Sequence, residues 1–127
     1  MGCCSCRSLY SVAGGERMKR IACYGSLKKG FWNHQRFGEM KFVREQVLDG
    51  LQIYISTVPF PFCVKEEGGK THVEVYDVDQ NHFNMLDNME KGAGYYPLMI
   101  ADMTIWIYPK QPEGSQKGNE CWQGEHL

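Results

Sequence analysis

The fold of this chain is decided by the stretch Ile21-Ala22-Cys23-Tyr24-Gly25-Ser26-Leu27-Lys28-Lys29-Gly30, which Phe31-Trp32-Asn33-His34 follows at once. An apolar run rich in strand-forming residues stops at Gly25, and Gly30 ends the basic turn after it. The pattern predicts a strand over about residues 19–24 that runs into a tight exposed loop. Loops held by a rigid strand often carry binding sites, so this loop is the first candidate for one.

The loop has the backbone chemistry of an anion cradle. Glycine lets the backbone approach a ligand without interference from a Cβ atom, and successive N–H groups in such a turn can bind an anion. The backbone N–H groups of Gly25, Ser26 and Leu27, with Tyr24 beside them, are therefore candidate donors to a carboxylate or a phosphate. An ordinary strand and turn without a ligand is the alternative. A nucleotide P-loop is excluded, because a glycine spacing that ends in Lys-Ser or Lys-Thr is absent.

On the C-terminal side of this loop, the spacing of apolar residues predicts several strands and two helices. Residues 41–55 predict two strands joined by a bend at Asp49-Gly50, residues 66–70 predict a turn, and residues 71–78 predict another strand. Residues 95–108 predict one or two more strands. A short helix is expected at residues 33–37, and Asp79 can cap a longer one that runs to Glu90.

Glu90 has an unusual position at the end of the predicted helix. The sequence after it, Lys91-Gly92-Ala93-Gly94, stops a helix. A carboxylate there faces the negative end of the helix dipole, which disfavours its charge and raises its pKa. Such an acid is suited to general acid–base chemistry near neutral pH.

Composition limits the classes of partner. The 127 residues fit one domain, and 14 basic against 15 acidic side chains give a net charge of −1. This balance gives no electrostatic reason to expect nucleic acid or an anionic membrane as a partner. No apolar run approaches the ~18 residues of a membrane-spanning helix. No feature of the sequence indicates an oligomeric state.

Six cysteines do not predict a disulfide framework, because three of them crowd the first six residues and the others are scattered singly. A reduced, cytoplasmic protein without a metal site is expected. Residues 1–17 lack periodicity and are expected to form a flexible extension, residues 18–109 the folded domain, and residues 110–127 a mobile tail on which only Trp122 is a candidate for docking. Lys28 is expected to be a solvated charge, with contact to a ligand as the alternative.

Two separated motifs resemble those of the γ-glutamylcyclotransferase-like superfamily. The first is Tyr24-Gly25-Ser26-Leu27-Lys28-Lys29-Gly30 with Asn33-His34. The second comprises Glu74-Val75-Tyr76-Asp77-Val78-Asp79, then Leu86-Asp87-Asn88-Met89-Glu90, and then Tyr96. The resemblance covers roughly residues 18–108 and looks closest to the short branch that includes the γ-glutamylamine cyclotransferases. It implies an α+β fold, with a small mixed β-barrel or strongly curved sheet and about two short helices.

The resemblance also implies a reaction that needs no cofactor. The α-amino group of a γ-glutamyl unit attacks its own γ-carbonyl, which releases 5-oxoproline and a free amine or amino acid. A small γ-glutamyl molecule is then the expected partner. Glu90 is the expected general acid and base, Tyr24, Gly25, Ser26 and Leu27 are expected to bind the substrate, and Tyr96 is expected to orient Glu90 or the substrate.

Two departures from the family pattern keep other functions open. Val73 stands where glycine usually precedes the glutamate of its strand, and Leu98 stands where a basic residue is often found. One alternative is a catalytically weak or inactive module that still binds a γ-glutamyl group or another carboxylate. The other is an interaction protein that works through its terminal extensions.

Overall fold

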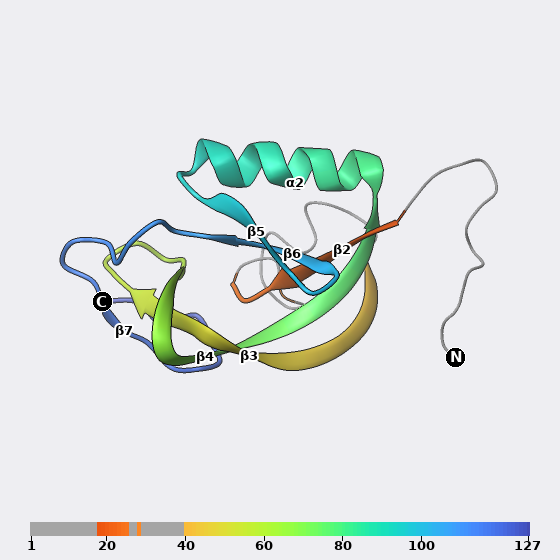
Figure 1. Ribbon diagram of the computed structural model, residues 1–127. Coiled ribbons are helices and arrows are strands. Elements are labelled where there is room, and N and C mark those ends of the chain that lie inside the picture. The colour runs from red at the N-terminus through yellow and green to blue at the C-terminus, as the bar shows by residue number, and fades with distance from the viewer. Residues whose placement is uncertain (1–17, 26–27, 29–39) are drawn as a thin grey trace.

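The structure is a computed structural model that describes residues 18–25, 28 and 40–127. Its elements are β2 (Met18–Cys23), β3 (Lys41–Ile55), β4 (Phe62–Asp79), α2 (Gln80–Gly92), β5 (Tyr96–Ile100), β6 (Met103–Ile107) and β7 (Gln116–Lys117). The strands form a single six-stranded sheet in the order β5-β6-β2-β4-β3-β7. Figure 1 shows that the sheet curls strongly and that α2 lies along one side of it.

The sheet is mixed, as the resemblance predicts. Strand β2 lies in its middle, antiparallel to β4 and parallel to β6, and every other neighbouring pair is antiparallel. The expected curved mixed sheet is confirmed. Of the two expected helices, the one at residues 79–90 is α2, and the one at residues 33–37 lies outside the described residues.

The curl comes from two long strands that bend at irregularities in their pairing. Asp49 pairs with Lys70 but Leu51 pairs with Lys65, so residues 66–69 bulge out of β4 opposite Gly50. Gly50 and Gly68 both have a φ of 84°, a conformation that favours glycine. The two strands predicted within residues 41–55 are thus one bent strand, and the turn predicted at residues 66–70 is a bulge inside β4.

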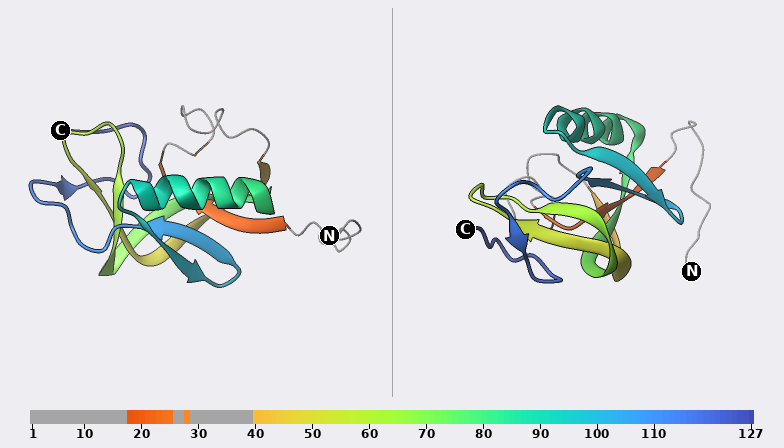
Figure 2. Two further views of the ribbon diagram at one scale, coloured as in Figure 1. Left: turned by 90° about the horizontal axis from the view of Figure 1, so that it is seen from above. Right: turned by 60° about the vertical axis from the view of Figure 1, so that its left-hand side comes forward.

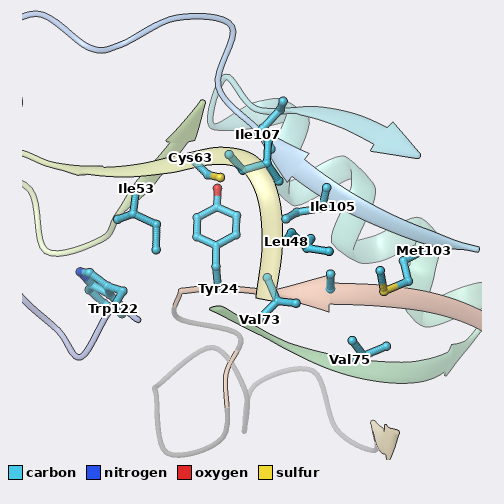
Figure 3. Close-up of a cluster of buried hydrophobic side chains, with 12 residues drawn as sticks. Tyr24, Leu48, Ile53, Cys63, Val73, Val75, Met103, Ile105, Ile107 and Trp122 are labelled. Carbon is cyan, nitrogen blue, oxygen red and sulfur yellow. The ribbon is translucent and has the colours of Figure 1, made fainter. Parts of the chain in front are cut away.

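Two apolar clusters hold the sheet in this shape. One lies between α2 and the sheet, and there Leu86 of the helix packs among Ile21, Val78 and Trp106. Both views of Figure 2 show the helix across that face. The other cluster lies within the curl and includes Ile53, Cys63, Val73, Ile105 and Trp122, as Figure 3 shows. Together they bury the large apolar side chains that stabilise a chain of this size.

The segment after Pro109 is part of the folded body rather than the mobile tail that its composition predicts. Strand β7 pairs with β3, and the backbone N–H of Gly118 donates to the carbonyl oxygen of Ile53 at 2.8 Å. The side chain of Trp122 is only 1% exposed, so it does dock on the body. Backbone pairing and one large apolar side chain outweigh a polar composition here. The predicted extension at residues 1–17 lies outside the described residues.

No helix within the described ranges is long and apolar enough to cross a membrane.

Candidate active site

Gly25 follows shortly after the end of β2 and lies in close contact with Pro61. The strand is anchored by buried residues from Ile21 to Tyr24, and the carbonyl oxygen of Gly25 then accepts a hydrogen bond from the backbone N–H of Lys28 at 2.9 Å. This bond spans the tight turn that the sequence predicts. A Cβ atom on Gly25 would lie 2.8 Å from Cγ of Pro61, so the close approach requires glycine. Ser26 and Leu27, the other two predicted cradle residues, lie outside the described residues.

Pro61 connects this turn to the residues that follow α2. Its carbonyl oxygen accepts a hydrogen bond from the hydroxyl group of Tyr95 at 2.9 Å. The ring of Tyr95 stacks on Phe62, with 5.9 Å between the ring centroids, and meets the edge of Tyr108 at 5.2 Å. The aromatic contacts fix Tyr95, which in turn fixes the proline against which Gly25 packs.

Helix α2 begins and ends at definite residues, and its end positions Glu90. The side chain of Asp79 accepts a hydrogen bond from the backbone N–H of His82 at 2.8 Å, as an N-cap does. At the other end, the carbonyl oxygen of Glu90 accepts from the backbone N–H groups of Ala93 and Tyr95. Gly94 follows with a φ of 95°, which turns the chain into β5.

The carboxyl group of Glu90 is poorly solvated. Burial raises its pKa from 4.5 to about 7. The sequence argument also gives a raised pKa, but from the helix dipole, whereas the cause in the structure is loss of contact with water. Within the described part of the chain, no hydrogen bond or ion pair involves this carboxyl group, so it is available to a ligand.

Glu90 lies close to the end of β2. Its negative charge is one of the causes that raise the pKa of Cys23, Tyr24 and Tyr95, after burial, which is the largest cause for each. Like charges at short range have this effect. The acid in the last turn of α2 and the strand end that precedes Gly25 therefore share one region of the molecule, although they are more than sixty residues apart in the sequence.

The two predicted tyrosines occupy different surroundings from each other. Tyr24 is 7% exposed, and its hydroxyl group donates a hydrogen bond to the carbonyl oxygen of Trp106 at 2.8 Å. In Figure 3 this hydroxyl points toward Cys63, into the cluster within the curl. Tyr96 also packs against that cluster, whereas the preceding residue, Tyr95, packs in the cluster on the α2 face. A role for Tyr96 stays a prediction, and Glu90 contributes to the raised pKa of both Tyr24 and Tyr95.

Lys28 is buried rather than solvated. Only 2% of it is exposed, and its ammonium group donates to the carbonyl oxygen of Trp122 at 2.7 Å. The sequence argument missed this contact because 94 residues separate the two partners, and no local pattern identifies a lysine that the C-terminal segment covers.

The two departures from the family pattern occupy different surroundings from each other. Val73 is fully buried in the cluster within the curl. Leu98 lines a surface pocket of about 400 Å³, whose other residues are Asp49, Gly50, Leu51, Lys65, Glu66, Glu67 and Ile100. Neither Gly25 nor Glu90 lines that pocket. Within the described residues, no group of histidine, cysteine and acidic side chains is arranged to hold a metal ion.

Comparison with known proteins finds relatives that cover most of this chain. The family model described as "Gamma-glutamyl cyclotransferase, AIG2-like" matches residues 21–125, a range that includes most of the segment after Pro109. A protein of Pyrococcus horikoshii whose provisional name is gamma-glutamylcyclotransferase is 33% identical over 105 residues, which are 80% of this chain and 88% of that protein. A gamma-glutamylaminecyclotransferase C of Danio rerio is 33% identical over 85 residues, which are 60% of this chain and 56% of that protein.

Solved structures share the fold. The crystal structure of the same Pyrococcus protein gives a TM-score of 0.67 at 33% identity and covers 78% of this chain and 84% of that one. An AIG2-like protein from Mus musculus gives a TM-score of 0.70 at 20% identity, with 84% and 88% of the two chains covered. The family match over most of the sequence leads to one conclusion: the chain belongs to the gamma-glutamyl cyclotransferase, AIG2-like family, whose members are cyclotransferases.

Proposed function

We propose that this protein is a γ-glutamyl cyclotransferase that releases 5-oxoproline from a small γ-glutamyl compound, with Glu90 as the general acid and base. One observation carries the proposal: a carboxyl group with a pKa of about 7 and no partner among the described residues lies beside the strand that leads to the Gly25 turn. Membership of a cyclotransferase family supports the reaction class.

The proton transfers follow from the chemistry of the substrate. The α-ammonium group must lose a proton before its nitrogen can attack the γ-carbonyl carbon. A carboxylate with a pKa of about 7 is a stronger base than an ordinary glutamate, whose pKa is 4.5, so it accepts this proton more readily. The new C–N bond closes a five-membered ring and the old one breaks. Glu90 then returns the proton to the leaving nitrogen.

Positioning supplies the rest of the catalysis. The nucleophile and the electrophile belong to one molecule, so the reaction needs no cofactor, and well-oriented intramolecular reactions reach effective molarities of ~10⁵ M or more. The backbone N–H groups of Gly25, Ser26 and Leu27 would hold the α-carboxylate, with Tyr24 beside them. Tyr96 would support the substrate from the start of β5. These binding roles are part of the proposal.

The proposed leaving group is an amine. The name of the Danio rerio relative specifies γ-glutamylamines.

The proposed setting is the reduced cytoplasm. Cys23, Cys63 and Cys121 all carry free thiols, which supports this setting. No membrane-spanning helix occurs in the described ranges.

A substrate panel tests the proposal. The purified protein is incubated with γ-glutamyl-lysine, another γ-glutamyl-amine, a γ-glutamyl dipeptide and glutathione, and 5-oxoproline is measured by chromatography. We expect product from at least one compound and a fall in kcat of about 10²-fold or more in Glu90→Gln. Glu113→Gln, which changes an exposed glutamate far from α2 in the sequence, is the matched control.

Three results would contradict the proposal in whole or in part. Absence of 5-oxoproline from the whole panel would remove the activity, and calorimetric binding of a γ-glutamyl compound without turnover would favour a binding module instead. Unchanged turnover in Glu90→Gln would remove Glu90 from the mechanism.

A further inference from the structure

A second group of reactive side chains does not include Glu90. Glu45, His72 and Cys121 form a line in which Oε1 of Glu45 is 2.7 Å from Nε2 of His72, and Nδ1 of His72 is 3.4 Å from Sγ of Cys121. Acid, imidazole and thiol in this order form the arrangement that activates cysteine nucleophiles. The proposed cyclotransferase reaction uses none of the three.

The fold brings these residues together from three segments. Val47 pairs with His72 across β3 and β4, so Glu45, two residues before Val47, reaches the same face of the sheet. The backbone N–H of His72 donates to the carbonyl oxygen of Glu120 at 2.9 Å, which places the next residue, Cys121, beside the imidazole ring. Backbone hydrogen bonds therefore hold His72 in contact with both Glu45 and Cys121.

The sulfur atom is also surrounded by hydrogen-bond donors. The side-chain amide of Gln123 lies 3.1 Å from it, and the ammonium group of Lys28 lies 3.6 Å from it. When Nε2–H of His72 donates to Glu45, Nδ1 is free to accept the proton of the thiol. The resulting thiolate would face an imidazolium, an ammonium and an amide, all of which stabilise a negative charge.

We propose that Cys121 is a thiol-modification site that reacts with small disulfides by thiol–disulfide exchange. His72 takes the proton of the Cys121 thiol, and the thiolate attacks one sulfur of the disulfide. The S–S bond of the disulfide breaks, a mixed disulfide forms on Cys121, and the departing thiolate takes the proton from His72. One thiol and one disulfide enter, and one thiol and one disulfide leave, so no further oxidant is needed.

The other two described cysteines have no such setting. Cys23 and Cys63 are buried within the sheet, and burial raises the pKa of both thiols, that of Cys63 to about 12. Cys121 is partly exposed and can meet a reagent. Its modification would also disturb the contact with Lys28, whose backbone N–H closes the Gly25 turn.

The test uses the 127-residue chain with Cys3, Cys4 and Cys6 changed to serine, so that the thiols left are those described in the structure. The probe is 2-hydroxyethyl disulfide, which carries no γ-glutamyl group, and the product is followed by intact mass and peptide mapping. Rates are measured at about pH 6 and about pH 10 for this chain and for His72→Gln, with His126→Gln as the control for an exposed histidine.

We expect the mixed disulfide on Cys121 before Cys23 or Cys63. At about pH 6 the His72→Gln rate should fall about tenfold, because no imidazole is left beside Cys121 to take the proton of its thiol. At about pH 10, where hydroxide in solution can take that proton instead, the two rates should agree within about threefold. His126→Gln should match the parent at both values.

Two outcomes would overturn the proposal. One is a first modification at Cys23 or Cys63, and the other is a deficit in His72→Gln that is equal at both pH values, which would mean that His72 only supports the local structure. If His72→Gln does not fold by circular dichroism, Glu45→Gln takes its place with a smaller loss at about pH 6. None of these results depends on cyclotransferase activity.

Discussion

Replacing Glu90 with glutamine should change how stability depends on pH, independently of any substrate. Burial places the pKa of this carboxyl group at about 7, against an ordinary value of 4.5 in an unfolded chain. The folded state therefore binds this proton more tightly than the unfolded state does. Between pH 4.5 and about 7 the folded state carries more protons, so the free energy of unfolding falls as the pH rises through that range.

The size of the effect follows from the gap between the two pKa values. Each unit of pKa corresponds to about 1.4 kcal/mol, which sets an upper limit of about 3 kcal/mol. Glu90 keeps some exposure, and screening by solvent lowers the expected change to about 2 kcal/mol. Glutamine resembles the neutral acid in shape and cannot ionise. The variant should therefore match the native protein below pH 4.5 and exceed its stability by about 2 kcal/mol above about pH 7.

Urea unfolding at a series of pH values measures this difference directly. Other titrating groups affect both proteins alike, so the free energy of the variant minus that of the native protein isolates Glu90. Glu113→Gln, at an exposed position, should follow the native curve throughout. A Glu90→Gln difference that does not vary with pH would mean that the carboxyl group is solvated, and would refute both the buried acid and its suitability as a base near neutral pH.

Three further changes test the framework around the site. Gly25→Ala should lower stability by about 1–3 kcal/mol in urea unfolding, because the new Cβ would lie 2.8 Å from Cγ of Pro61; a Pro61→Ala change in the same chain should recover part of the loss, and full additivity would contradict the clash. Trp122→Ala should cost about 3–5 kcal/mol, since this side chain is 1% exposed, and a loss below about 1 kcal/mol would mean that the C-terminal segment is not docked. Asp87→Asn should cost about 1–2 kcal/mol at neutral pH, because hydrogen bonds from Trp106 and Lys91 lower the pKa of this carboxyl group; the cost should disappear as the pH falls below 3.8, and a cost that persists in acid would contradict the charge effect.

Local sequence signals predict the parts of this fold that depend on neighbouring residues. Asp79 caps α2, the helix stops just after Glu90, and the strand before Gly25 ends in a tight turn. Each of these features depends on residues within four positions of one another, so the pattern contains the information. The raised pKa of Glu90 is also predicted, but its main cause is burial, which requires the packed structure.

Features that depend on distant partners escape the sequence argument. Gly50 and Gly68 are typical turn residues, yet here they allow long strands to bend, because β3 and β4 are neighbours along almost their whole length. Lys28 and Trp122 are 94 residues apart, and only the fold places them in contact. Tyr95 and Tyr96 are adjacent in the sequence, yet they pack in different apolar clusters, which a motif cannot show.

The pairing of β7 with β3 determines how the chain can be shortened. Tyr54 and Ile55 would lose their partners Lys117 and Gln116 in a protein cut after Pro109. The outer border of β3 would then present unpaired backbone groups, and the space within the curl would lose Trp122. An uncovered strand of this kind recruits strands from other molecules, so a shortened chain should self-associate and precipitate.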